Sequence, residues 1–155
     1  MKITVKTILM PIILLLALFG NAQEKTSTWT KFKEVDGVTV DYQYVECTNM
    51  NYGFDTKSIL LKITNTTKEA KKVDWDLDLW YNNELVTGEN KDEEYHHTAV
   101  LRPETVIEGT CDDFYSTYKI FVKFTDPQYK GTNPKELTDF SLTNIQVESF
   151  HNTEK

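Results

Sequence analysis

Three aspartates alternate with apolar residues along residues 73–81, the most regular pattern in this chain. Side chains of a strand point to opposite faces with a period of two, so Asp74, Asp76 and Asp78 should share one face. Neighbouring carboxylates there could share a Ca²⁺ ion only with help from loop oxygens, because this ion takes about six to eight ligands. The interpretation that we favour is a solvated face whose aspartates pair with lysines of adjacent strands, namely Lys62, Lys119 and Lys123.

One pair of adjacent histidines, His96 and His97, follows the acidic run of residues 92–94. Adjacent residues of a strand point apart, so we expect a surface or edge pair rather than a metal chelate. No G-x-S-x-G, H-E-x-x-H or glycine-rich phosphate motif is present. A triad could still assemble from distant residues, because triads are defined by geometry rather than by order. A hydrolase with an unrecognised site near His96 is therefore an alternative to our expectation of a protein without enzymatic activity or cofactor.

Four aromatic residues suggest recognition. Trp80 and Phe121 fall on the polar phases of their strands, and Tyr95 and Tyr115 flank acidic segments. Exposed together, these rings would form a platform for a sugar or an anchor for a partner protein, since amphipathic rings are favoured at such sites. If a loop covers them instead, they form a second small core. The sequence leaves both possibilities open.

The first 22 residues have the composition of a secretory signal peptide. Two lysines give a basic start, residues 8–19 are mostly apolar, and small residues precede a cleavage position before Gln23. The apolar run is too short to span a bilayer, which takes roughly 20 apolar residues. We therefore expect one mature domain, residues 23–155, in the periplasm or outside the cell and not inserted in a membrane.

The two cysteines, Cys47 and Cys111, lie in this mature part. In an exported protein an even number of cysteines indicates a disulfide, and two cysteines allow one intramolecular pairing. The bridge would close a loop of about 64 residues, worth about 4 kcal/mol in the chain-entropy model.

The charge of the chain excludes several kinds of partner. The formal net charge is −7, and removal of the two leader lysines makes it −9. Phosphate binding needs a basic face, and the chain has a single arginine, Arg102. The charge therefore disfavours nucleic acid and anionic membrane surfaces as partners, and we expect an unknown protein or glycan instead.

The elements that position these residues are short strands. Period-two patterns and turn signals predict nine segments, separated by polar loops such as residues 48–57. They are residues 29–35, 38–47, 58–65, 73–81, 84–87, 95–101, 106–111, 118–125 and 137–147. Seven to nine short strands indicate an all-β antiparallel sandwich, with a small closed barrel as the alternative.

Two local features refine this expectation. Asp36-Gly37 separates two extended runs, which is a strong hairpin signal because glycine accepts the positive φ of such a turn. In the last strand the apolar phase shifts between Phe140/Leu142 and Ile145/Val147. A strict period of two forbids that shift, so we predict a β-bulge near Asn144.

Three stretches of the chain resemble parts of immunoglobulin-like β-sandwich modules. Residues 59–67 resemble a strand followed by an Asn-Thr turn, Leu79-Trp80-Tyr81-Asn82 resembles the end of an aromatic strand, and residues 101–104 resemble a Leu-x-Pro turn. Such modules are common among small exported bacterial proteins, mostly of unassigned function. The resemblance implies an immunoglobulin-like sandwich acting as a binding or structural interaction module. A carbohydrate-binding module using the exposed aromatics is a further alternative.

The position of the cysteines differs from that in antibody-type immunoglobulin domains. In antibody-type domains the buried tryptophan packs against the bridge between the two sheets. Here a whole strand separates Cys47 from Trp75 and Trp80, and Cys47 lies on the opposite face from Val38 and Val40. We therefore expect the bridge to be a staple at the rim or end of the sandwich.

Overall fold

The structure is a computed structural model that describes residues 28–49, 53–87, 93–113, 116–129, 131 and 134–150. The predicted signal peptide, residues 1–22, and Tyr115 lie outside these residues. No helix of the described residues is long and apolar enough to cross a membrane.

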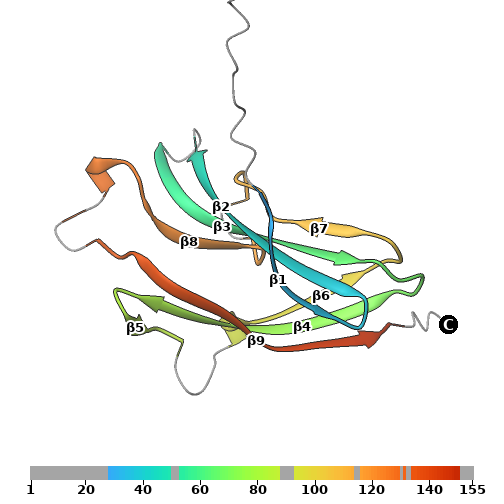
Figure 1. Ribbon diagram of the computed structural model, residues 1–155. Helices are drawn as coiled ribbons and strands as arrows, with labels where there is room; N and C mark the ends of the chain where they lie inside the picture. The colour runs from blue at the N-terminus through green and yellow to red at the C-terminus, as the bar shows by residue number, and fades with distance from the viewer. Residues whose placement is uncertain are drawn as a thin grey trace, which may run out of the picture.

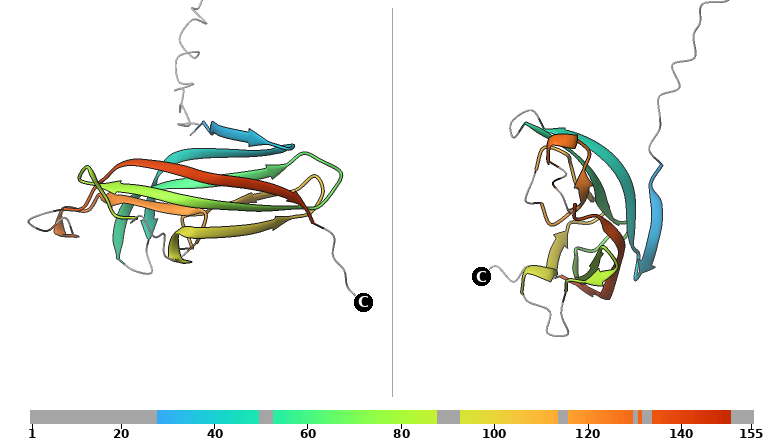
Figure 2. Two further views of the ribbon diagram at one scale, coloured as in Figure 1. Left: turned by 90° about the horizontal axis from the view of Figure 1, so that it is seen from below. Right: turned by 90° about the vertical axis from the view of Figure 1, so that its left-hand side faces the viewer.

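The described residues form two antiparallel sheets that face each other as two layers (Figures 1 and 2). Sheet A contains β1 (Thr30–Val35), β2 (Val38–Asn49), β3 (Phe54–Asn65), β7 (Val106–Glu108) and β8 (Lys119–Phe124). Sheet B contains β4 (Lys71–Tyr81), β5 (Glu84–Leu85), β6 (His96–Leu101) and β9 (Leu137–Ser149). Two short 3-10 helices, η1 (Glu93–Tyr95) and η2 (Pro127–Tyr129), complete the described elements. The all-β sandwich is thus confirmed, and the closed barrel is not the architecture.

All nine predicted strands are present, with small shifts at their ends. The largest difference concerns residues 54–57, which were expected in a loop and instead begin β3. They pair with residues 46–49 of β2, and the polar side chain of Thr56 is buried beside Ser58. Pairing with a long neighbouring strand therefore overrides a loop-like local composition.

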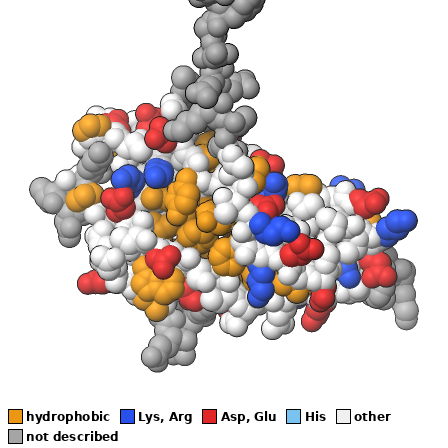
Figure 3. All heavy atoms as spheres, in the orientation of Figure 1, with side chains coloured by type: hydrophobic (Ala, Val, Ile, Leu, Met, Phe, Trp, Pro, Cys, Tyr) orange, Lys and Arg blue, Asp and Glu red, His pale blue; other side chains and the backbone are white. Residues whose placement is uncertain are grey.

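The core lies between the sheets and is built from the alternating apolar positions. On β4 the odd-numbered residues Val73, Trp75, Leu77 and Leu79 are buried. They meet Ile59, Leu61 and Ile63 of β3 in one cluster. The side where β1 and β2 approach β9 is closed by aromatic rings in contact, those of Phe32, Tyr42, Tyr44 and Phe140. In the orientation of Figure 1, hydrophobic side chains gather in the middle of the visible surface, with charged side chains around them (Figure 3).

Each central strand has one interrupted edge. β9 pairs with one edge of β4, whereas the other edge pairs with β6 over residues 71–76 and with β5 at residues 80–81. Similarly, the outer edge of β3 pairs with β7 over residues 62–64 and with β8 over residues 56–60. Beyond β5 the backbone of Leu79 bonds to Val86 and to the Thr87 hydroxyl, so the part of this edge that no described strand covers is at Leu77 and Asp78. Leu77 also lines a pocket between the sheets.

The predicted hairpin and bulge are both confirmed. Asp36 and Gly37 have φ values of 46° and 77°, as a two-residue hairpin turn between twisted strands requires. The register between β4 and β9 shifts opposite residues 74–76, and Asn144 there has a φ of 51°. Asparagine tolerates this left-handed conformation better than most residues.

A buried asparagine joins the connections between the sheets. Asn65 is 1% exposed, and its amide donates to the backbone carbonyls of Glu69 (2.7 Å) and Arg102 (3.0 Å). Its carbonyl oxygen accepts from the backbone N–H and the hydroxyl of Thr67. Since β3 leads to β4 here and β6 leads to β7, this Asn65 cluster fastens two crossovers from one sheet to the other.

The disulfide between Cys47 and Cys111 is present, with a Cα–Cα distance of 5.3 Å. It links β2 to the segment between β7 and β8, all of which belong to sheet A or its connections. The bridge is thus a staple on one sheet and not a pin between two.

Candidate functional site

The outer face of sheet B carries the predicted row of carboxylates. Asp74, Asp76 and Asp78 alternate with the buried apolar residues of β4, so the predicted division of faces is confirmed. Trp80 continues the same row. Asp76, however, is only 8% exposed, so the expectation of three fully solvated aspartates is wrong for this residue.

The expected partners of these aspartates are also wrong. Lys62 lies on β3 and pairs with Asp41, while Lys119 and Lys123 lie on β8. Both strands belong to sheet A, so these lysines belong to the other layer. An alternating pattern specifies which face a side chain occupies but not which strands become neighbours.

Asp76 is held by one side chain from each neighbouring strand. Its carboxylate lies 2.7 Å from Nδ1 of His96 on β6 and accepts a 2.7 Å hydrogen bond from Nδ2 of Asn144 on β9. The bulge supplies the extra residue that brings the Asn144 amide to the carboxylate. The His96 side chain is 54% exposed. A fixed, buried acceptor therefore lies directly behind an accessible imidazole.

The two flanking aspartates are bound in the same manner. Asp74 accepts from the Lys72 ammonium (2.7 Å) and from the Thr98 hydroxyl, and Asp78 accepts from the hydroxyls of Thr87 and Thr143. Burial raises the pKa of the Asp74 carboxyl, but the hydrogen bonds from Lys72 and Thr98 outweigh it and leave the pKa below its usual value. All three carboxylates are thus kept in place by donors from side chains.

No group of three or more His, Cys, Asp or Glu residues in the described part of the chain is arranged to hold a metal ion. The Ca²⁺ interpretation of Asp74, Asp76 and Asp78 stays a prediction.

A depression of about 370 Å³ lies over this network. Its walls combine charged, amide and imidazole groups from three strands, Lys72, Asp74, Asp76, His96, Asn144 and Gln146. We call this surface, together with Asp78 and Trp80, the polar face. It presents both donors and acceptors to a ligand.

The histidine pair divides between the two sides of sheet B, as predicted. His96 belongs to the polar face, whereas His97 packs against the ring of Trp75, with centroids 5.5 Å apart. Burial lowers the pKa of His97, and the charge of His96 adds to the lowering. The His97 imidazole is therefore neutral at pH 7.

The three predicted aromatics that the structure describes, Trp80, Tyr95 and Phe121, do not form one platform. Trp80 lies on the polar face, whereas Phe121 and Tyr95 line a pocket between the sheets. The ring of Phe121 contacts that of Phe124, which in turn contacts Phe54 and Tyr129 of η2. For Phe121 the interpretation as part of a second small core is thus the better one.

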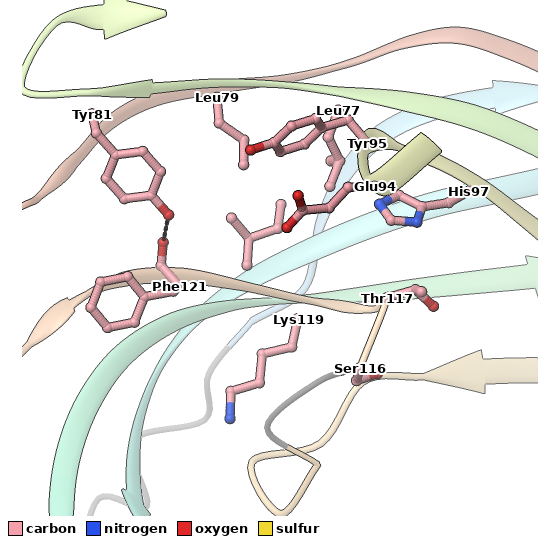
Figure 4. Close-up of a pocket in the computed structure, with 11 residues that line it drawn as sticks. Leu77, Leu79, Tyr81, Glu94, Tyr95, His97, Ser116, Thr117, Lys119 and Phe121 are labelled. Carbon is pink, nitrogen blue, oxygen red and sulfur yellow. Dashed lines mark hydrogen bonds between the residues drawn. The ribbon is translucent and has the colours of Figure 1, made fainter. Parts of the chain in front are cut away.

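The pocket between the sheets, about 310 Å³ in volume, was not anticipated from the sequence (Figure 4). In its lining the Tyr81 hydroxyl of sheet B donates a 2.6 Å hydrogen bond to the Phe121 carbonyl of sheet A. Burial and, to a smaller extent, Tyr95 raise the pKa of Tyr81 to about 12, so the hydroxyl stays a donor at neutral pH. Because its walls come from three separate segments, residues 77–81, 94–97 and 116–121, no local pattern signals this pocket.

Comparison of the chain with protein families, with curated proteins and with solved structures finds no match.

Proposed function

We propose that this protein is an exported binding module without enzymatic activity, and that it binds a hydroxyl-rich ligand such as a glycan on the polar face. The observation that carries the proposal is the fixed position of Asp76, 8% exposed and bonded to His96 and Asn144. Carboxylates accept strong hydrogen bonds from hydroxyl groups. A group that is already immobilised loses little entropy on binding, which favours affinity.

The composition of the polar face selects the kind of ligand. Three carboxylates with one nearby ammonium, that of Lys72, disfavour an anionic ligand. Amide and imidazole donors together with carboxylate acceptors suit neutral hydroxyls. Trp80 follows four residues after Asp76, about 13 Å along a strand, and its ring could stack on a sugar. An extended glycan that reaches both residues is therefore the favoured ligand.

Export is supported by the signal-like residues 1–22 and by the disulfide, which persists in oxidising compartments. The periplasm or the extracellular space is the proposed location.

The first test is a glycan array probed with the oxidised protein without its leader. We expect binding to a restricted set of neutral glycans, with affinity then measured by calorimetry. Gln146→Ala and Trp80→Ala should weaken binding, because both residues present their side chains on the polar face. Asp41→Asn, on sheet A, serves as the matched control and should bind normally. An array without any binding, or unchanged affinity in both variants, would remove the sugar proposal.

The His96–Asp76 pair favours a second candidate, a hydrolase. A carboxylate that orients an imidazole is the arrangement of a general base. Within the described residues, however, no hydroxyl or thiol is hydrogen-bonded to His96 as a nucleophile would be. An enzyme of this type would have to activate water. Hydrolysis of ester or glycoside substrates that disappears in His96→Ala, with glycan binding retained, would support it over the binding module.

A further inference from the structure

The pocket between the sheets is a second concave surface, separate from the polar face because it lies on the inner side of β4. Its inner walls are apolar, formed by Leu77 and Leu79 of β4 and Ile120 of β8. The rings of Tyr81, Tyr95 and Phe121 surround them, and Glu94, His97, Ser116, Thr117 and Lys119 complete the lining. Its volume, about 310 Å³, is at the small end of the range for ligand pockets, roughly 300–1,000 Å³.

One charged group points into this pocket. The Glu94 carboxylate extends toward the middle, between the Tyr95 ring and the apolar walls (Figure 4). Among the described residues, no cation forms an ion pair with this carboxylate and no donor is hydrogen-bonded to it. The pocket therefore presents a negative charge beside apolar and aromatic walls.

The nearby basic groups do not offset this charge. The Lys119 side chain points away from Leu79 and Tyr81 (Figure 4), and its ammonium donates a 3.0 Å hydrogen bond to the Cys111 carbonyl. His97, also in the lining, has a pKa lowered by burial and is neutral at pH 7. An anionic ligand would consequently meet a carboxylate without a compensating cation from these residues.

We infer that this pocket binds a small organic cation, an ammonium group carried on an apolar body about the size of one aromatic ring. The faces of tyrosine and phenylalanine rings attract cations through their quadrupole. Glu94 supplies the opposite charge, and Leu77, Leu79 and Ile120 bury the apolar part. The net charge of −7 for the chain raises the local concentration of cations around it.

Calorimetry with four probes of one shape tests the inference: benzylamine, benzyltrimethylammonium, benzyl alcohol and benzoate, each titrated into the oxidised protein. We expect saturable binding of the two cations, binding of the alcohol that is weaker by about tenfold or more, and no binding of benzoate. NMR should place the benzylamine shifts at Thr117, His97 and Tyr95. Shifts confined to the polar face, or the absence of saturable binding, would overturn the inference.

A variant that removes the charge of Glu94 distinguishes binding in the pocket from the general attraction of cations to an acidic protein. Glu94 is exposed on a short 3-10 helix, so Glu94→Gln should fold normally. It should bring the affinity for benzylamine down to that for benzyl alcohol. Glu108→Gln, which removes the same charge from exposed β7, should keep the preference for the amine. Equal loss in both variants, or retention of the preference in Glu94→Gln, would contradict the proposed role of the pocket. None of these outcomes depends on the glycan proposal.

Discussion

Two clusters of buried polar groups contrast in where their partners come from. Asn65 bonds largely to the backbone, to the carbonyls of Glu69 and Arg102 and the N–H of Thr67. Asp76 bonds to the side chains of His96 and Asn144, both of which reach the surface. The first cluster fixes connections between sheets, and the second holds an acceptor beneath a surface that a ligand can reach. Satisfied hydrogen bonding alone therefore does not separate a structural site from a binding site, but the accessibility of the partners does.

The contrast predicts that the Asn65 cluster contributes more to stability. Asn65→Ala removes four hydrogen bonds, each worth about 1 kcal/mol, although the carbonyls of Glu69 and Arg102 each keep a threonine hydroxyl as donor. We therefore expect a loss of about 3 kcal/mol in the free energy of unfolding. Thr66→Ala in the same turn removes an exposed hydroxyl that donates to Gly37 and should cost less than about 1 kcal/mol. Urea unfolding of the three proteins measures the difference. Similar losses in both variants would show that the turn, and not the amide of Asn65, is important.

Replacement of Asp76, the buried acceptor of the polar face, should lower the free energy of unfolding less than replacement of Asn65. In Asp76→Ala the exposed partners His96 and Asn144 can turn to water, so we expect a loss of about 2 kcal/mol or less. Glycan binding should be abolished in the same variant, since the fixed acceptor is gone. A loss of stability as large as that of Asn65→Ala, with binding retained, would make Asp76 a structural residue.

Asn144 combines a backbone role with a side-chain role, and two substitutions separate them. Asn144→Ala should cost about 1 kcal/mol, because alanine disfavours a φ of 51°. Asn144→Gly keeps the bulge without that strain and should stay closer to the wild-type stability, yet still weaken ligand binding through the lost bond to Asp76. Thermal unfolding and calorimetry on both variants provide the two readouts. Normal binding by Asn144→Gly would exclude a positioning role for the amide.

The smallest expected effect depends on pH. The pKa of Asp74 lies below 3.8 in the folded protein, so its ionised form stabilises the fold above about pH 4, and this contribution is lost as the pH falls through the folded-state pKa. Asp74→Asn should thus be slightly less stable than wild type at pH 7, and the difference should shrink as the pH falls through the folded-state pKa of Asp74. Urea midpoints measured from pH 2.5 to pH 7 give the comparison. A constant difference over that range would mean that the charge of Asp74 contributes nothing.

Local patterns were sufficient to predict most of the fold. The alternation along β4 specified its buried face, Asp36-Gly37 specified the hairpin, and the phase shift in β9 specified the bulge at Asn144. Each of these features depends on the backbone conformation of a few neighbouring residues. They could be predicted because the physical cause lies within one segment.

The partners of Asp76 could not be predicted in the same way. His96 and Asn144 come from strands 20 and 68 residues further along the chain, and their approach depends on strand order. The pocket between the sheets has the same origin, since its walls are residues of β4, of η1 and β6, and of β8 with the residues before it, which only the tertiary arrangement brings together. The sequence therefore identified the carboxylates and one histidine of the polar face but not their arrangement.

The position of the disulfide also determines how the protein would respond to mechanical force. Because the bridge closes the 64-residue span between Cys47 and Cys111, a pull on the two ends of the chain cannot extend that span while the bond is intact. At about 3.3–3.6 Å per extended residue, the fully extended oxidised chain is shorter than the reduced chain by roughly 210–230 Å. Reduction would release this length, so a single-molecule pulling experiment would report the redox state of the protein directly.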